Sequence, residues 1–264
     1  MMKKLVRLLI IVFCFSANAQ TETKKDFYPN GQLKFEIPYR NGMKNGIAKE
    51  YYENGKLKLL ETNVDNKREG IVKEFHENGT VKYELNYKND KANGIYKTYY
   101  ESGKLLGKIQ FVNDEKTGIE QGYYENGTLK YESPYANNQI NGNHREYFEN
   151  GSIKSITIFT NGKKNGIEKI YIETGELQYE MPFIEGDLTG FGKEYYINGK
   201  IKIQENYIND IRNGLSQKYY ENGQLKSETN YKDDKIIGET KEYYENGTQK
   251  TAIIINYDQN EEKK

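Results

Sequence analysis

Carboxylates are the side chains of this 264-residue sequence best suited to catalysis, because 39 Asp and Glu stand beside two His and one Cys. A glycosidase places a single pair of carboxylates across a cleft. The glutamates here instead recur at fixed positions, which are Glu53, Glu77, Glu101, Glu125, Glu149, Glu173, Glu221 and Glu245, and then Glu36, Glu84, Glu132, Glu180 and Glu228. Periodic carboxylates favour solvated Lys–Glu pairing, so we predict no catalytic residue and no enzyme activity.

Histidine and cysteine offer no metal site or nucleophile in this sequence. His76 stands at an aromatic position and His144 at a variable strand position, and neither has a local His or Cys partner. Cys14 lies inside an apolar run near the N-terminus. We therefore expect no metal and no cofactor.

The charge balance argues against nucleic acid as a partner. Lys and Arg number 39, equal to the acids, whereas a nucleic-acid binder needs a surplus of cations. A lysine three residues after a repeated glycine could form a basic stripe for anionic lipid: Lys34, Lys58, Lys82, Lys130, Lys154, Lys202, Lys226 and Lys250. A glutamate two residues further on is expected to neutralise it, so direct membrane binding is possible but not favoured.

These side chains belong to an internal repeat of 24 residues that has no insertion or deletion. Its first glycine follows Asn in eight of ten units, and the ten are Gly31, Gly55, Gly79, Gly103, Gly127, Gly151, Gly175, Gly199, Gly223 and Gly247. A second glycine follows 15 residues later, at Gly46, Gly70, Gly94, Gly118, Gly142, Gly166, Gly190, Gly214 and Gly238. The array spans 27–257, between a polar lead (20–26) and a charged tail (258–264).

Each unit reads as strand, turn, strand, turn. Asn-Gly predicts a type I′ hairpin turn at the first glycine, and apolar residues then alternate with Lys and Glu. A longer polar loop, such as 40–46, ends at the second glycine. The residue four before the first glycine is always aromatic: Phe27, Tyr51, Phe75, Tyr99, Tyr123, Tyr147, Tyr171, Tyr195, Tyr219 and Tyr243. We predict an all-β, elongated, single-layer antiparallel meander of about ten hairpins with nearest-neighbour contacts.

The first 19 residues are typical of a cleavable export signal. Lys3, Lys4 and Arg7 precede an apolar run, and Ala17-Asn18-Ala19 fits the small-x-small cleavage pattern. An uncleaved anchor is the alternative. Cleavage would leave a cysteine-free chain of net charge −3 in the periplasm, in the cell envelope or outside the cell.

The unit resembles the MORN repeat family, and more closely the variant of bacterial YwqK-type antitoxin proteins. The resemblance rests on Tyr-Tyr-Glu-Asn-Gly-x-Leu-Lys at 51–58, 123–130 and 219–226, and on Asn-Gly-x-x-Asn-Gly at 41–46 and 161–166. It implies hairpin repeats that act as scaffolds or binding surfaces, some of which neutralise a toxin, and no catalytic residues. An extra glycine of the common unit is replaced here, for example by Ile37 or Leu85.

The first functional hypothesis is a non-enzymatic, exported scaffold that binds a protein partner, with an antitoxin or immunity-type role as one form of it. Periodic Tyr on a wide sheet suits protein recognition. The alternatives are a glycan- or lipid-binding module of the envelope and a purely structural surface element. Because a specific site must break the periodicity, the predicted partner-binding residues are those that replace the usual polar or Tyr residues: Ile156, Ile158, Ile170 and Ile172.

Overall fold

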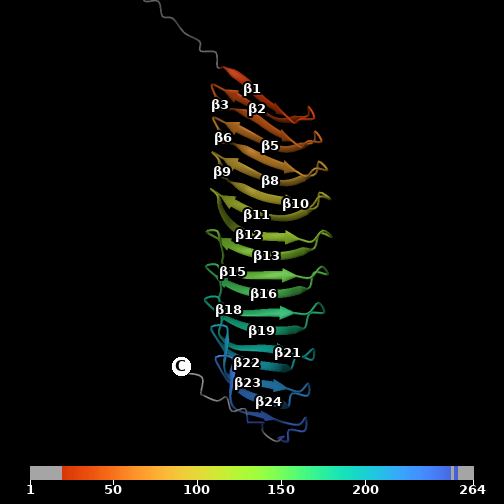
Figure 1. Ribbon diagram of the computed structural model, residues 1–264, viewed down its shortest axis with the longest axis vertical. Helices are drawn as coiled ribbons and strands as arrows, with labels where there is room; N and C mark the ends of the chain where they lie inside the picture. Colours follow the sequence, from red (N-terminus) through yellow and green to blue (C-terminus); the bar gives the residue numbers. More distant parts are fainter. Residues whose placement is uncertain (1–19, 251–252, 255–264) are drawn as a thin grey trace, which may run out of the picture.

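The computed structural model describes residues 20–250 and 253–254. The predicted signal (1–19) and charged tail (258–264) lie outside the described residues, as does the end of the tenth unit. Strands stack one after another along the long axis, and the two turns of each unit project from opposite edges (Figure 1). The predicted all-β, single-layer meander is confirmed.

All pairings of the described strands are antiparallel, and each main strand pairs with the next along the chain. The main strands are β1 (Thr21–Phe27), β2 (Leu33–Arg40), β4 (Gly46–Tyr51), β5 (Leu57–Val64), β7 (Gly70–Phe75), β8 (Val81–Lys88), β10 (Gly94–Tyr99), β11 (Leu105–Val112), β12 (Glu115–Tyr123), β13 (Leu129–Ala136), β15 (Gly142–Tyr147), β16 (Ile153–Thr160), β18 (Gly166–Tyr171), β19 (Leu177–Ile184), β21 (Gly190–Tyr195), β22 (Ile201–Ile208), β23 (Ile211–Tyr219), β24 (Leu225–Lys232) and β25 (Lys235–Glu242). Two-residue strands complete the sheet: β3 (Met43–Lys44), β6 (Lys67–Arg68), β9 (Lys91–Ala92), β14 (Gln139–Ile140), β17 (Lys163–Lys164), β20 (Asp187–Leu188) and β26 (Ile253–Ile254).

The type I′ turns lie at the opposite edge from the one predicted. Asn41 and Gly42 both have positive φ, at 51° and 78°, and join β2 directly to β3. The polar loop 40–46 is therefore a tight turn followed by a return strand. A bulge at Gly46 (φ 120°) separates β3 from β4, and a Cβ there would lie 2.9 Å from the Pro38 ring.

The first glycine of each unit closes a different turn. Gly55 N donates to Tyr52 O and Tyr52 N to Lys56 O, while Asn54 keeps a negative φ and its side chain caps Lys56 N. This is a four-residue turn that ends in a left-handed glycine, so the prediction of a type I′ turn here was wrong. All ten first glycines have φ between 80° and 105°, which confirms them as turn residues.

A β-bulge beside this turn decides which side chains share a face. Tyr99 pairs with Leu105, whereas its neighbour Thr98 pairs with Gly107, so residue 106 has no partner. The bulge therefore puts Leu105 on the same face as Tyr99 and opposite to the face that holds Ile109. The sequence pattern suggested that the aliphatic residue after the turn continues the apolar alternation of its strand. The structure shows that it does not. We call the face of Tyr99 face A and the face of Ile109 face B.

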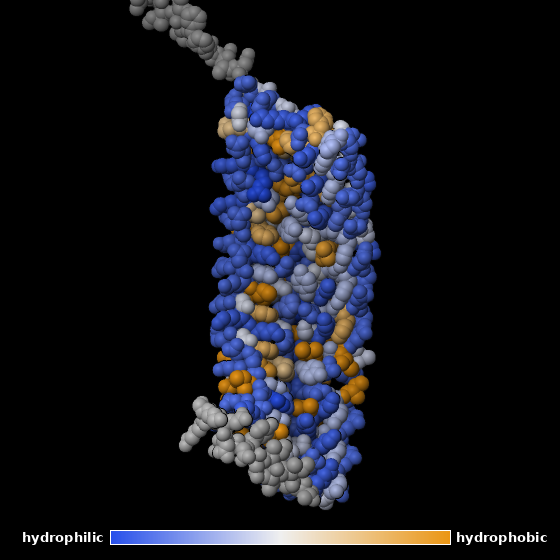
Figure 2. Space-filling model, in the orientation of Figure 1, coloured by the Kyte–Doolittle hydropathy of each residue, from blue (hydrophilic) through white to orange (hydrophobic). Residues whose placement is uncertain are grey.

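The core is shallow and lies on face B. Its buried apolar side chains include Ala48, Val72, Leu85 and Ile109, on the main strands β4, β7, β8 and β11. Aromatic rings pack beside them: the Tyr96 ring lies 5.7 Å from that of Tyr83. No second layer covers the described sheet, and in the view of Figure 2 hydrophobic residues follow the long axis between hydrophilic edges.

A hydrogen bond from a tyrosine hydroxyl links most units to the next. The residue after the repeated aromatic is usually Tyr, and its OH donates to the backbone carbonyl 23 residues later at 2.6–2.8 Å; the donors are Tyr28, Tyr52, Tyr100, Tyr124, Tyr196 and Tyr220. His76 keeps this contact through Nε2, 3.1 Å from Tyr99 O, which explains a histidine at an aromatic position. Phe148 and Ile172 have no hydroxyl, so two consecutive links in mid-array are missing.

Candidate binding face

The centre of face A carries one unbroken row of cross-strand neighbours, which we call the central row. It is formed by Lys25, Glu36, Lys49, Leu60, Lys73, Glu84, Lys97, Lys108, Gln121, Glu132, Arg145, Ile156, Lys169, Glu180, Lys193, Gln204, Gln217, Glu228 and Lys241. Nine members are cations and five are carboxylates, although the whole chain is neutral. Face A therefore has a positive surplus that the overall composition hides.

Each carboxylate of the central row has at least one cation as a direct cross-strand neighbour, and Glu36, Glu84 and Glu180 have one on both sides. Glu84 accepts from Lys97 Nζ at 3.1 Å and from Tyr99 OH at 2.9 Å, and Lys73 lies 3.2 Å away on the other side. Burial raises the pKa of Tyr99 to about 12, and the carboxylate that accepts from it adds to this rise. The hydrogen bond from Lys49 is the main cause of a lowered pKa at Glu36. These phenols therefore stay protonated donors while the carboxylates stay charged.

The carboxylates are recessed and the cations project. Glu36, Glu84, Glu132, Glu180 and Glu228 expose 18–24% of their side chains. Their bridged Lys and Arg partners in the row expose 36–49%. The charge that face A presents outward is therefore mostly positive.

The repeat alternates at this position, because glutamate occupies every second unit. Leu60, Lys108, Ile156 and Gln204 stand in the units between. Lys108 lies directly opposite Lys97 on one side and Gln121 on the other, so no carboxylate faces it across the sheet. Like charges directly opposite one another destabilise a sheet. This local surplus sits in mid-array.

An aliphatic row runs parallel to the central row on the same face. Its members stand on the strands that begin at the second glycine of each unit, two residues before the central-row residue. Its exposed members are Ile47, Ile71, Ile95, Ile119, Ile167 and Phe191, at 46–56% exposure. Asn143 takes this position in one unit, where exposed Ile158 pairs with it across the sheet, and Glu239 takes it in the last described unit. Exposed aliphatic side chains in register over this many units are a regularly spaced series rather than scattered residues, although polar side chains such as Asn86 and Gln110 stand between them.

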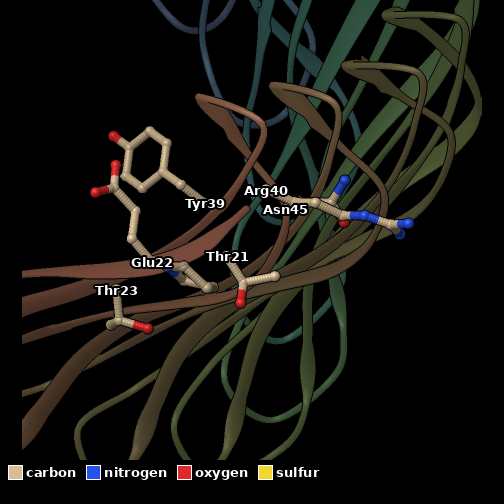
Figure 3. Close-up of a pocket in the computed structure, with 7 residues that line it drawn as sticks. Thr21, Glu22, Thr23, Tyr39, Arg40 and Asn45 are labelled. Atoms are coloured by element: carbon tan, nitrogen blue, oxygen red, sulfur yellow. The ribbon is translucent and has the colours of Figure 1, made fainter. Parts of the chain in front are cut away.

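Depressions form where proline stands opposite the aliphatic row. One, of about 280 Å³, is lined by Ile119, Pro134 and Arg145 among others, so it joins the apolar and the charged rows. A depression of about 300 Å³ occupies the equivalent place at the N-terminal end, beside Pro38. There Thr21 and Thr23 point to the opposite side of the sheet from Glu22 and Tyr39 (Figure 3).

Face B has hollows of another kind, where glycine replaces a larger side chain. Gly107 and Gly122 lie opposite each other and open a space of about 280 Å³ between Tyr96 and Tyr131. His144 packs nearby: its ring lies 6.2 Å from that of Tyr131, and Nδ1 is 2.7 Å from Ser133 Oγ. That histidine is therefore part of the packing of face B.

The four isoleucines predicted to bind a partner do not form one surface. Ile156 belongs to the central row, between Arg145 and Lys169. Ile158 lies on face A at the aliphatic row, whereas Ile170 lies on face B opposite Ser155 and Tyr179. Ile172 lies in the turn at one edge. The structure thus brings two of them to face A, and their partner-binding role stays a prediction.

The predicted lysine stripe lies elsewhere than expected. Lys82 Nζ is 2.7 Å from Glu74, and Lys202 Nζ is 2.7 Å from Glu194. Glu84, the predicted partner of Lys82 two residues further along the strand, binds the central-row cations Lys73 and Lys97 instead. The bulge is the cause, because it turns these lysines toward face B. The aromatic row before the turns lies on face A, where its hydroxyls support the central-row carboxylates.

The described residues contain no group of three or more His, Cys, Asp or Glu placed to hold a metal ion. Across residues 20–250 and 253–254, no helix has the length and apolar character needed to cross a membrane.

A family model described as MORN repeat variant matches nine segments of the chain: 23–41, 44–63, 68–89, 92–113, 116–137, 140–161, 164–185, 189–209 and 212–233. No curated protein matches the chain. A solved structure titled "Crystal Structure of TcdB2-TccC3-Cdc42" is 12% identical, covering 89% of this chain and 17% of that one, with a TM-score of 0.15. "Crystal Structure of TcdB2-TccC3" is 13% identical over 89% of this chain and 18% of that one, with a TM-score of 0.14. The chain thus spans less than a fifth of either.

Proposed function

Because the chain belongs to the MORN repeat variant family, we propose that it is a non-enzymatic repeat scaffold that binds a protein partner through face A. The observation that supports this is the aliphatic row, which leaves Ile or Phe half exposed in six units. Exposure of large apolar side chains to water is unfavourable. Their burial against a partner would lower the free energy of the complex.

The partner is met outside the cytoplasm in this proposal, because residues 1–19 have the pattern of a cleaved export signal. Neutralisation of an exported toxin is one role that such a scaffold would serve, as the resemblance to YwqK-type proteins implies. The export step has its own test: the N-terminal residue of the protein recovered from the envelope should be Gln20.

The experiment is affinity capture of tagged residues 20–264 from cross-linked native cells, read by mass spectrometry. Ile95→Glu places a charge in the middle of the aliphatic row. Ile197→Glu is the matched control, because Ile197 is 68% exposed but lies in a turn at the sheet edge. We expect a stoichiometric protein that the control retains and Ile95→Glu loses. Equal recovery with both variants would remove face A as the binding surface.

A second candidate function is glycan binding at the hollow beside Gly107 and Gly122. Tyr96 and Tyr131 line it together with the exposed edge of Leu106, and flat aromatic surfaces suit sugar rings. Gly122→Ala should abolish binding to purified cell wall, because its Cβ would lie 2.2 Å from the Tyr131 ring. Wall binding that survives this change would reject the hollow as the site.

A further inference from the structure

We propose that the occupant of face A is an extended, acidic protein segment with an apolar side chain at every third residue, lying along the long axis of the sheet. This inference rests on the proposed function and specifies its partner. Three features of face A select that chemistry: the spacing of the aliphatic row, the sign of the projecting charge and the position of the unmatched cation.

The spacing selects an extended chain. Successive members of the aliphatic row are two strands apart, which is about 9.6 Å at the usual strand separation. A polyproline II segment repeats its side-chain direction every three residues, or about 9.3 Å. An α-helix returns to the same direction after seven residues, or about 10.5 Å. Its mismatch with the spacing of the aliphatic row is about three times that of a polyproline II segment. A β-strand repeats after about 6.7 Å and does not match.

The charge selects acidic residues between the apolar ones. The central row runs one pleat away from the aliphatic row, and its cations project while its carboxylates are recessed. A segment whose apolar side chains contact Ile95 and Ile119 would bring its intervening side chains to Lys97 and Lys108. A carboxylate there would pair with Lys108, which has no carboxylate opposite it across the sheet, whereas Lys97 already binds Glu84.

The same features disfavour the other occupants. A second copy of face A would set two projecting cation rows against each other. An anionic bilayer would also meet the projecting cations, but a flat lipid surface has no feature that matches the spacing of the aliphatic row. Both therefore enter the experiment as outcomes that count against the proposal.

The test uses three fluorescent 18-residue peptides as probes: (Leu-Glu-Pro)6, (Leu-Lys-Pro)6 and an acidic peptide of equal charge with leucine at every seventh residue. At about 3.1 Å per residue, the first spans six positions of the aliphatic row. Anisotropy titrations with residues 20–264 should give (Leu-Glu-Pro)6 a Kd at least tenfold lower than either other peptide.

Two charge variants identify the site. Lys108→Glu supplies the glutamate that alternate units have, so the protein should stay folded with an unchanged or higher Tm. The same change should raise the Kd of (Leu-Glu-Pro)6 at least fivefold. Lys104→Glu makes the same change of net charge in the exposed turn of the same unit and should leave the Kd within twofold.

Equal binding of the acidic and basic extended peptides, or a preference for the seven-residue spacing, would overturn the proposal. So would binding that Lys108→Glu leaves unchanged, binding of phosphatidylserine vesicles that the peptide does not displace, or concentration-dependent dimerisation lost in Ile95→Glu. If the captured partner depends on Ile95 but (Leu-Glu-Pro)6 does not bind, the scaffold function stands and the extended acidic occupant is rejected.

Discussion

Removal of a tyrosine hydroxyl from one unit and addition of one to the next should change the stability of the array in opposite directions. Tyr124 OH donates to Tyr147 O at 2.8 Å, whereas Phe148, one unit further on, has no hydroxyl to offer Tyr171 O. The two turns are otherwise alike. Tyr124 N donates to Thr128 O at 2.9 Å, and Phe148 N donates to Ser152 O at 2.9 Å. Tyr124→Phe therefore removes a link from one interface, and Phe148→Tyr adds one to the next.

The magnitude follows from the partial burial of these bonds. A hydrogen bond of this kind contributes about 1 kcal/mol net. For a chain of this size, about 1 kcal/mol corresponds to a Tm change of about 2–4 °C. We expect Tyr124→Phe to lower the Tm by that amount, Phe148→Tyr to raise it by a similar amount, and the double variant to return close to the starting value.

Calorimetry and urea unfolding of residues 20–264 measure the global effect, and hydrogen exchange locates it. In Phe148→Tyr, amide protection should rise in β15, β16 and β18, which flank the new link, and should stay constant near β1. A destabilising or neutral Phe148→Tyr beside a destabilising Tyr124→Phe would refute the reasoning, because it would show that these hydroxyls do not bind units to one another.

In urea unfolding, the free energy of unfolding of Ile156→Glu should exceed that of Ile156→Gln by about 0.5 kcal/mol, because only the carboxylate pairs with Arg145 and Lys169. Equal stability of the two variants would contradict this. The lowered pKa of Glu36 means that its contribution is complete above the ordinary glutamate value of 4.5 and is lost as the pH falls through and below it. Melting of the protein between about pH 6 and about pH 3 should thus show a smaller loss of Tm in Glu36→Gln, and parallel curves would reject the pairing. Gly46→Ala should lower stability by about 1–3 kcal/mol in urea, because of its positive φ and the nearby Pro38 ring. Gly118→Ala should lower it less, since nothing lies within 4 Å of a Cβ there, and the reverse order would show that the contact is unimportant.

The repeat and its hairpins could be predicted because glycine and alternation are local signals. The 24-residue spacing of Gly55 and its equivalents sets the turns, and strict alternation over residues such as 83–87 sets the strands. The positions of the two turn types could not be inferred from Asn-Gly alone. Paired Asn or Asp residues such as Asp65-Asn66 adopt positive φ just as well, and they were the signal for the type I′ turns.

The binding face was harder to predict because one unpaired residue reverses the side-chain direction. Without the bulge at Leu106, the lysine stripe and the central-row glutamates would share a face, as the alternation indicated. The aliphatic row was visible as Ile or Phe one residue after most second glycines, but its exposure depends on the absence of a second layer. The hydroxyl link also left a signal, a second aromatic residue in most units, whose partner lies 23 residues away.

The alternation of glutamate along the central row bears on how the gene can change in length. Recombination between units two apart joins equivalent units, so units with and without the carboxylate still alternate along the row. Recombination between adjacent units instead gives two successive units that both carry the carboxylate, on either side of one intervening residue, or two successive units that both lack it. Gain or loss of units in pairs would therefore preserve the electrostatic pattern, and a lineage that selects for this surface should show arrays that differ by about 48 residues rather than about 24.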